Sequence, residues 1–393
     1  MSQPAIQLSA LSVDVLNNET DFDEIKGEWD ELLNDSNQRV YFLRWSWNRL
    51  WWKTHAPPQS RLYLVTCRDS SRHLVGLAPL YWRRISRAGV QHGEVLFLGT
   101  GIPITISEHL DLIARRGYEK QVAETIASHI IRDENVDRLW LNEIPITSIM
   151  LPHFRRVIGQ HQSVRVCNRS HFIDTRVTWD DFTKSLSKST RHNLAYYLRR
   201  LFKQHNCRFG KVEAPDQLEP AIDDLIRLHQ ARWQAKGEPG SFSLPGFEQF
   251  LKEAIQSSFA EGQLRLWTLG VGEQTAAVLL AFVDKGVAHY FQGGFDPAFA
   301  KDSVGTVMLG LCIRACIESE DILEFDFMGG DAAYKERWTK SGWDSVVFER
   351  LRPGVRSSLF RVYESGERAG KSFVRMVMPE AIRLARRKRM HGK

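Results

Sequence analysis

Apolar residues recur along the first 175 positions in two spacings that predict helices and strands in alternation. Positions 22, 25, 29, 32 and 33 are apolar with the spacing of one helical face, which predicts a helix that packs by one side. The runs that predict strands are 62–67, 74–82, 94–98, 109–114, 138–142 and 164–168, and the segments that predict further helices are 118–132 and 150–159. The aromatic segment 41–52 is interpreted as a helix wedged between layers, with a ligand platform as the alternative.

From residue 180 the same order of elements starts again. Residues 187–205 predict a basic amphipathic helix, whose cationic side is either a solvated face or a landing site for an anionic ligand. A helix around 220–233 follows, and then strand-like runs at 264–269, 275–283 and 287–291. We therefore expect a duplicated architecture, with no Pro/Gly/Ser-rich linker near residue 175 to separate its halves.

The stretch 288–338 concentrates the candidate chemistry. A strand at 288–291 runs into the turn 293–297, a helix opens near Ser303, and a second strand at 323–328 ends in two glycines. Polar and aromatic residues follow that strand end, namely Asp331, Tyr334, Lys335 and Trp338. Because a helix start presents unpaired N–H groups, this strand, turn, helix and strand unit predicts a site for an anionic ligand.

Composition places the chain among ordinary globular proteins. Of its 393 residues, 43% are hydrophobic and 25% are charged. No uncharged apolar run reaches the length of a membrane-spanning helix, and the first residues lack the pattern of a secretory signal, so the cytoplasm is the expected compartment. The five cysteines are odd in number and widely spaced, which argues against a disulfide framework. Cys312 and Cys316 share a helical face and are interpreted as core residues, and no metal site is expected.

The positive charge is concentrated at the C-terminus. Residues 351–393 carry twelve Lys or Arg against three acids, a net +9, so the remaining 350 residues carry −3 of the total +6. This part of the chain is close to neutral, so its net charge does not indicate binding to nucleic acid. The tail predicts a peripheral contact with an anionic membrane surface at the inner membrane face, or with a synthase complex, and a solubilising end is the alternative.

His109 and Asp111 alternate with leucines in the run 109–114. This pattern places both polar side chains on one face of a strand. A solvated surface is the preferred interpretation, and a catalytic dyad is the alternative.

The stretch HYFQGGFDPAFAKDSVGTVML followed by FDFMGGDAAYKERW resembles the C-terminal half of the BioF-like acetyltransferases of the GNAT superfamily, a group that includes the CelD proteins of cellulose biosynthesis. The RHNLAYYLRRL helix, the RWQAKG segment and the RP pair at 352–353 add to the resemblance. It implies an α/β (α+β) fold of two tandem GNAT-like domains, as in the related Fem-type aminoacyl transferases. Each domain would be a mixed, mostly antiparallel sheet flanked by helices, at 1–175 and 176–352, with a basic helical tail at 353–393.

The resemblance also implies acetyl-CoA or another acyl-CoA as donor, with its pyrophosphate at a helix start. The aligned positions are Ser303, Gly305 and Thr306, and Arg191 of the basic helix is a further candidate for donor binding. Asp302 stands where the family has Gln or Arg. An acid there is expected to repel phosphate and to weaken the donor site.

Acyl transfer needs a base for the nucleophile and a proton donor for the leaving thiolate. We expect Asp326 or His289 as the base and Tyr334 as the donor, with Lys335 and Asp331 binding substrate or donor. The alternative is that an Asp and a Lys pair to pin the loop after the strand.

Two further interpretations of the whole chain remain open at this point. One is a catalytically degenerate GNAT-fold scaffold in exopolysaccharide (cellulose) biosynthesis, and the other is a Fem-like transferase that takes aminoacyl-tRNA. The nucleophile-elbow, P-loop, HExxH and paired CxxC motifs are absent, which weakens hydrolase, NTPase and zinc-enzyme interpretations.

Overall fold

One sheet runs through the computed structural model, which describes residues 10–87, 89–101, 105–204, 206–330 and 332–354. Its strand order is β1-β2-β3-β4-β6-β13-β7-β12-β11-β10-β9-β8, and β5 pairs with β3. The strands are β1 (Ser12–Leu16), β2 (Ser60–Arg68), β3 (Leu74–Arg87), β4 (Val90–Phe97), β5 (Ile113–Ala114), β6 (Arg138–Pro145), β7 (Gln162–Asp174), β8 (Cys207–Lys211), β9 (Leu264–Val271), β10 (Gln274–Asp284), β11 (Val287–Phe295), β12 (Glu324–Asp326) and β13 (Gly342–Leu351).

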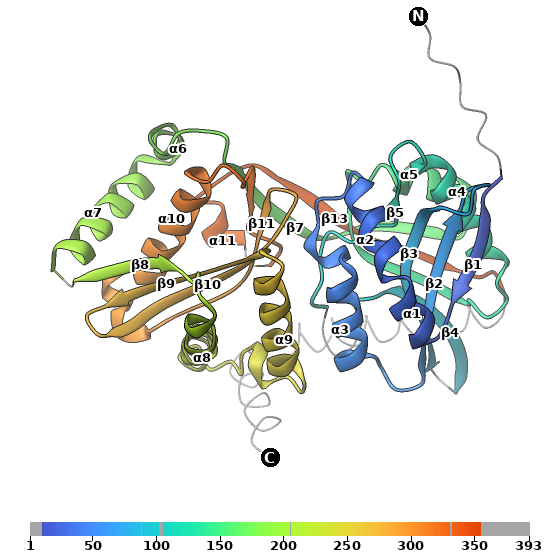
Figure 1. Ribbon diagram of the computed structural model, residues 1–393, viewed down its shortest axis with the longest axis horizontal. Helices are drawn as coiled ribbons and strands as arrows, with labels where there is room; N and C mark the ends of the chain where they lie inside the picture. Colours follow the sequence, from blue (N-terminus) through green and yellow to red (C-terminus); the bar gives the residue numbers. More distant parts are fainter. Residues whose placement is uncertain (1–9, 88, 102–104, 205, 331, 355–393) are drawn as a thin grey trace, which may run out of the picture.

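Helices cover both halves of this sheet (Figure 1). They are α1 (Glu19–Glu24), α2 (Lys26–Asp35), α3 (Trp45–His55), α4 (Glu119–Arg132), α5 (Met150–Ile158), α6 (Trp179–Ser185), α7 (Lys188–Gln204), α8 (Pro215–Gln234), α9 (Phe247–Ala260), α10 (Val304–Ile317) and α11 (Ala332–Lys335). Short 3₁₀ helices lie at η1 (Tyr41–Leu43), η2 (Ser241–Ser243) and η3 (Pro297–Asp302). None of the helices in these described ranges is both long and apolar enough to cross a lipid bilayer.

The N-terminal half is built from antiparallel neighbours. Strands β1 to β4 pair antiparallel in sequence order, and β4 pairs with β6 in parallel. Helix α4 buries an apolar stripe from Val122 to Ile130 against β2 and β3, and α5 packs on α4. The α/β expectation for this half, with its mostly antiparallel sheet, is confirmed.

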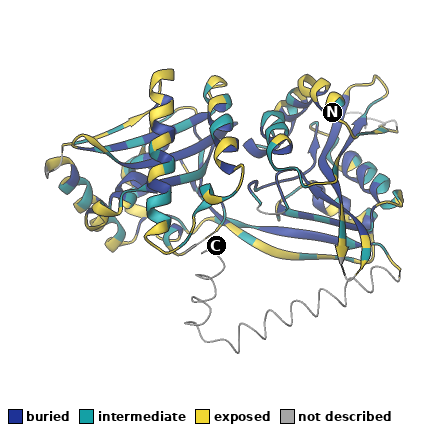
Figure 2. Ribbon diagram, turned by 90° about the horizontal axis from the view of Figure 1, so that it is seen from below, coloured by how far each residue is buried: buried dark blue, intermediate teal, exposed yellow. Residues whose placement is uncertain are grey.

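Strands β7 and β13 join the two halves. One end of β7 pairs with β13, and its other end pairs with β12 of the C-terminal sheet. Strand β13 lies between β6 and β7, so the last described strand belongs to the N-terminal sheet although it follows the C-terminal elements in sequence. Figure 2 shows these two long strands passing from one half to the other beneath the helices.

The C-terminal half packs helices on both faces of its sheet. Strand β10 is buried on both sides, with Val278, Leu280 and Phe282 in one core and the alternating residues Ala277, Leu279 and Ala281 in another. Helices α8 and α9 cover the first face, and α10, backed by α7, covers the second. The first core continues into the N-terminal half, where the ring of Trp47 on α3 lies 4.8 Å from that of Phe250 on α9.

Two neighbouring strands separate in the C-terminal sheet. Parallel pairing of β11 with β12 covers three residue pairs, from Val287 with Glu324 to His289 with Asp326. Strand β11 then continues to Phe295 without β12 beside it. The sheet therefore opens beyond His289, and α10 begins beside this opening.

Two of the predicted core segments are buried, and one predicted strand is mostly absent from the described residues. The aromatic segment forms η1 and α3 with Trp47 and Trp51 buried, and Cys312 and Cys316 lie in the second core, so both interpretations as core are confirmed. The expected strand 109–114 is wrong except for β5, because His109 takes a left-handed backbone conformation with φ of 58°. The basic tail 353–393 lies outside the described residues apart from Pro353 and Gly354.

Candidate functional site

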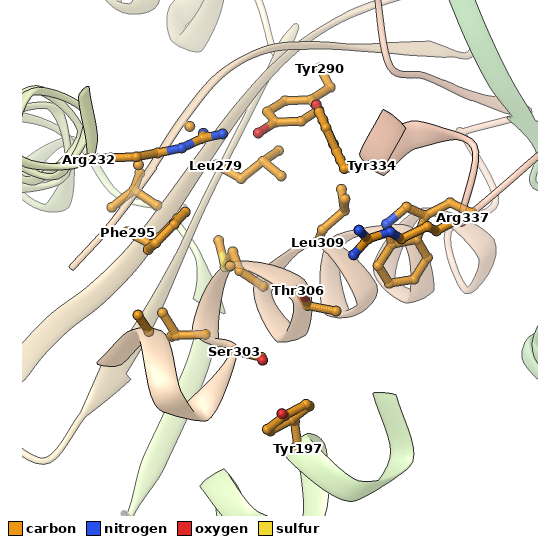
Figure 3. A pocket seen from close by; sticks show the side chains of 18 of the residues that line it. Tyr197, Arg232, Leu279, Tyr290, Phe295, Ser303, Thr306, Leu309, Tyr334 and Arg337 are labelled. Carbon is orange, nitrogen blue, oxygen red and sulfur yellow. The ribbon is translucent and has the colours of Figure 1, made fainter. Parts of the chain in front are cut away.

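A cavity of about 440 Å³ opens where β11 and β12 separate. Its walls come from β10, β11, the first turns of α10, one side of α7, and the segment after β12 (Figure 3). The residues that line it include Tyr290, Gly294, Phe295, Ser303, Gly305, Thr306, Tyr334, Arg232 and Arg337.

The start of α10 forms one wall of the cavity. Ser303 is the N-cap residue, with φ of 50° and ψ of 37°, and its carbonyl accepts the N–H of Thr306 at 2.9 Å. A Cβ on Gly305 would lie 2.9 Å from Cδ1 of Phe295, so glycine lets the helix approach β11 closely. The structure thus brings Ser303, Gly305 and Thr306 together at one helix start, where unpaired N–H groups and the helix dipole favour an anion.

Two arginines enter the cavity from opposite sides. Figure 3 shows Arg232, from the end of α8, and Arg337, which follows α11, on either side of Leu279 and Leu309. The guanidinium carbon of Arg232 lies 5.2 Å from the centre of the Phe295 ring. No acidic residue is among the described residues that line the cavity. Neither arginine was predicted from the sequence as a site residue, although both lie in segments that carry the family resemblance.

Asp302 does not stand at the cavity, which corrects the sequence-based expectation. Its carboxylate pairs with Nε of Arg200 on α7 at 2.8 Å, and Asp302 is not a lining residue. The physical reason is the left-handed backbone conformation of Ser303, which turns the chain between Asp302 and the first turn of α10. The Asp302 side chain therefore points away from the residues that line the cavity. The acid is thus neutralised beside the helix start instead of facing a ligand.

Two tyrosines line the inner wall of the same cavity. Figure 3 shows the rings of Tyr334 and Tyr290 close together on the side opposite Tyr197. Burial raises the pKa of Tyr290, and the nearby Arg232 opposes that rise, so the hydroxyl keeps its proton near neutral pH. A phenol in this position can donate a proton to a leaving group.

Asp326 and His289 lie away from the cavity in a buried cluster. Oδ2 of Asp326 is 2.7 Å from Nε2 of His109 and 3.3 Å from Nδ1 of His289, and Oδ1 accepts the N–H of Met328 at 2.7 Å. His289 and Tyr290 are successive residues of one strand, so their side chains point to opposite faces. The cluster therefore lies behind the wall that Tyr290 forms.

His109 comes from the N-terminal half and is buried, contrary to the prediction from sequence. His109 and Asp111 are 3% and 7% exposed, so the solvated-surface interpretation is incorrect. Burial alone would raise the pKa of Asp326 and lower that of His109. Their pairing outweighs burial, holding the Asp326 pKa well below its usual value and raising that of His109 to about 9.

Carboxyl groups crowd the same region, where the two halves meet. Burial and then the charge of Glu108 raise the pKa of Glu143 to about 7. Glu108 accepts the N–H of Gly329 at 2.6 Å, which ties the loop after β12 to the N-terminal half. Glu143 and Met328 have φ values of 61° and 60°, a left-handed conformation that costs energy for residues with a side chain.

The other residues predicted for the site are Lys335, Arg191 and Asp331. Nζ of Lys335 donates to the carbonyl of Met328 at 2.7 Å and to that of Gly329, and the residue is 3% exposed, so its ammonium holds the loop after β12. Arg191 donates to the carbonyl of Lys184 at 3.2 Å and is not a lining residue of the cavity. Asp331 lies outside the described residues.

The sequence of the C-terminal half and the fold of the chain are each similar to those of known proteins. Residues 188–336, which hold the cavity, match the family model described as an acetyltransferase (GNAT) domain. No curated protein matches the chain by sequence.

Solved structures match over most of the length of the chain. A crystal structure of FemX has 9% identity and a TM-score of 0.60, and the match covers 86% of this chain and 98% of FemX. The C-terminal domain of a putative lysylphosphatidylglycerol synthetase from Agrobacterium fabrum has 11% identity and a TM-score of 0.50, covering 88% of this chain and 96% of that one. L-PGS from Bacillus licheniformis has 13% identity and a TM-score of 0.52, covering 87% and 96%. At these identities the likeness is one of fold.

Proposed function

We propose that the protein transfers an acyl group from a phosphate-bearing donor bound in the cavity at the start of α10, because residues 188–336 match the acetyltransferase (GNAT) family model and the fold of the chain is similar to that of FemX. The observation that carries this proposal is the charge of the cavity. Arg232 and Arg337 line it together with the first turn of α10, and no acid is among its described lining residues.

The arrangement suits an anion for two additive reasons. Unpaired N–H groups at a helix start carry roughly half a positive charge. Two guanidinium groups add fixed positive charge in a recess, where their attraction for phosphate is stronger than in open water. The pairing of Asp302 with Arg200 removes the acid that would oppose this attraction.

The chemistry needs few groups. An amine or hydroxyl of the acceptor attacks the carbonyl carbon of the donor, and the bond to the donor's sulfur breaks as the new bond forms. The leaving thiolate takes a proton, for which Tyr334 is the proposed donor, and the acceptor gives up one proton to a base or to water. The sequence predicts Asp326 or His289 as the base. Both are buried behind the cavity wall, so neither is proposed to contact the acceptor directly.

Acetyl-CoA or another acyl-CoA is the first proposed donor. Its pyrophosphate would lie at Ser303, Gly305 and Thr306, and its thioester would point toward Tyr334. Isothermal titration of the full-length protein with acetyl-CoA tests this assignment. No detectable heat near millimolar donor would favour the alternative of a degenerate scaffold in polysaccharide synthesis.

An aminoacyl donor is the second candidate. Its support is the fold shared along most of the chain with FemX and with the lysylphosphatidylglycerol synthetases. The cationic residues of α7 beside the cavity would suit a polynucleotide phosphate chain. Binding of aminoacyl-tRNA that weakens steeply between low and moderate salt would support this donor, and binding of acetyl-CoA alone would remove it.

The acceptor is proposed to be a cell-envelope or polysaccharide-related molecule, from the resemblance to the CelD-type proteins. The basic tail 353–393 is proposed to bring the protein to an anionic membrane surface or a synthase complex from the cytoplasmic side. Sedimentation with anionic vesicles, comparing the full chain with one ending at residue 354, tests the tail. Equal recovery of the two chains would exclude tail-driven membrane binding.

A further inference from the structure

Three metal-ligating side chains meet where the halves of the chain join. They are His109, from the loop between β4 and β5, His289 of β11 and Asp326 of β12. Nε2 of His109, Nδ1 of His289 and Oδ2 of Asp326 all lie within 4.8 Å of one another, and all three residues are buried. Two imidazoles and a carboxylate form a donor set that suits zinc and other divalent first-row metals.

The hydrogen bonds of His289 fix which of its nitrogens is available. Nε2 lies 3.2 Å from the carbonyl oxygen of Arg39, and a carbonyl only accepts, so Nε2 carries the hydrogen. In the neutral ring Nδ1 then has a lone pair, which faces the carboxylate oxygen Oδ2 of Asp326 at 3.3 Å. A metal ion placed beside these two atoms would be bound by both of them. A ring N–H held by a backbone carbonyl is the usual support of a metal-binding histidine.

The charge around the three ligands also favours a cation. Glu108 and Glu143 interact electrostatically with His109, and Glu324 with both His109 and Asp326. With Asp326 this makes four carboxyl groups near the three ligands, together with the positive charges of Arg39 and Lys335, which interact with Glu324 and Glu108. The carboxyl oxygens can interact favourably with a cation bound there.

Aromatic rings shield the site from water. The ring of Phe42 lies 5.5 Å from that of His289, and the ring of Trp343 lies 5.6 Å from that of His109. The indole Nε1 of Trp343 is 3.5 Å from Nδ1 of His109, at the outer limit of a hydrogen bond. Such an apolar shell raises the cost of leaving charges unpaired and strengthens metal–ligand attraction.

We propose that His109, His289 and Asp326 bind one divalent transition-metal ion, with zinc as the first candidate, and that this ion joins the N-terminal half to the C-terminal half. Two ligands come from the neighbouring strands that separate at the cavity, and the third crosses from the other half. The ion would thereby hold the back of the cavity wall. This site is independent of the proposed donor, since its ligands do not line the cavity.

The test is a zinc titration of the full chain after removal of metals with a chelator. The expected result is one zinc ion per chain, and visible absorption bands of a low-coordinate site when cobalt replaces zinc. At a hundredfold excess of zinc over its Kd, the unfolding temperature should rise by about 5 °C. Absence of stoichiometric zinc or cobalt binding would overturn the proposal.

A matched pair of variants separates metal binding from hydrogen bonding. The amide of His109→Gln can still donate to Asp326, but it is a poor zinc ligand, so zinc affinity should fall by more than about 100-fold while the apo protein keeps its fold by circular dichroism. His192→Gln, on the exposed side of α7, should bind zinc as the wild type does. Unchanged zinc binding in His109→Gln would place the ion elsewhere and contradict the proposal.

Discussion

The carboxylate of Asp302 lies 2.8 Å from Nε of Arg200, on the side of the α10 start that faces α7 and not the cavity. The position that looks worst for a phosphate in the sequence is therefore neutralised in the structure. The cavity keeps the positive potential of Arg232, Arg337 and the helix start. The proposed donor site depends on this pairing.

Removal of Arg200 should expose the charge of Asp302 to the donor. We expect Arg200→Ala to lower the affinity for acetyl-CoA by about 3–10-fold, because an unpaired carboxylate beside the helix start repels phosphate. Arg199→Ala removes the same charge from an exposed neighbouring position of α7 and should change the affinity less than twofold. Equal losses in the two variants, measured by calorimetry, would mean that general charge and not the Asp302 pair controls binding.

Gly294 sets the distance between β11 and α8. A Cβ at this position would lie 2.3 Å from the backbone nitrogen of His229, so one of the two backbones must move. Gly294→Ala should lower the free energy of unfolding by about 1–3 kcal/mol and weaken donor binding, because Gly294 also lines the cavity. Gly210→Ala on β8, where nothing lies within 4 Å of the added Cβ, is the control. Denaturant unfolding that ranks the two variants as equally stable would contradict this packing argument.

Tyr334 should affect turnover more than binding. Loss of a general acid costs about 10²–10⁴-fold in rate, so we expect Tyr334→Phe to lower kcat by at least about 100-fold with little change in KM. Tyr118→Phe, at the start of α4 in the N-terminal half, should behave as the wild type. Full turnover by Tyr334→Phe with a defined acceptor would remove this residue from the mechanism.

Glu143 should make stability depend on pH. Its folded pKa of about 7 lies above the ordinary 4.5, so the folded state holds a proton that the unfolded state has lost. The free energy of unfolding is therefore expected to fall as pH rises from about 4.5 to 7, by on the order of 2–3 kcal/mol, and then to level off. Glu143→Gln, which stays neutral, should flatten this part of the profile, and Glu134→Gln on the surface should not. Urea unfolding at several pH values, with a chelator present, measures the difference, and an unchanged slope in Glu143→Gln would contradict it.

Those parts of the fold that depend on neighbouring residues could be predicted from the sequence. Apolar spacing predicted most strands and helices, and the turn at 293–297 predicted the helix start near Ser303, because both signals arise from neighbouring residues. The choice of Ser303, Gly305 and Thr306 as donor-binding residues came from the family resemblance. Lys335 of α11 holds the loop after β12 through backbone carbonyls, whereas the alternative raised from sequence had a Lys pairing with an Asp.

Contacts between distant segments were not predictable in this way. His109 meets Asp326 across 217 positions through a left-handed residue, and no periodic pattern marks such a turn. Asp302 looked adverse because sequence order gives no side-chain direction around the turn at Ser303. The return of β13 to the N-terminal sheet likewise follows from strand pairing along β7, which only the folded chain displays.

Calorimetric titration of acetyl-CoA into the wild type and into the double variant Arg232→Gln, Arg337→Gln tests the central claim most directly. The same titration with S-acetyl-pantetheine, which has the thioester but no phosphate, completes the comparison. The cavity as described predicts that the wild type binds acetyl-CoA at least about tenfold more tightly than S-acetyl-pantetheine, and that the double variant loses this preference. Equal affinity of the wild type for the two ligands, or an undiminished preference in the double variant, would contradict an anionic donor site at the start of α10.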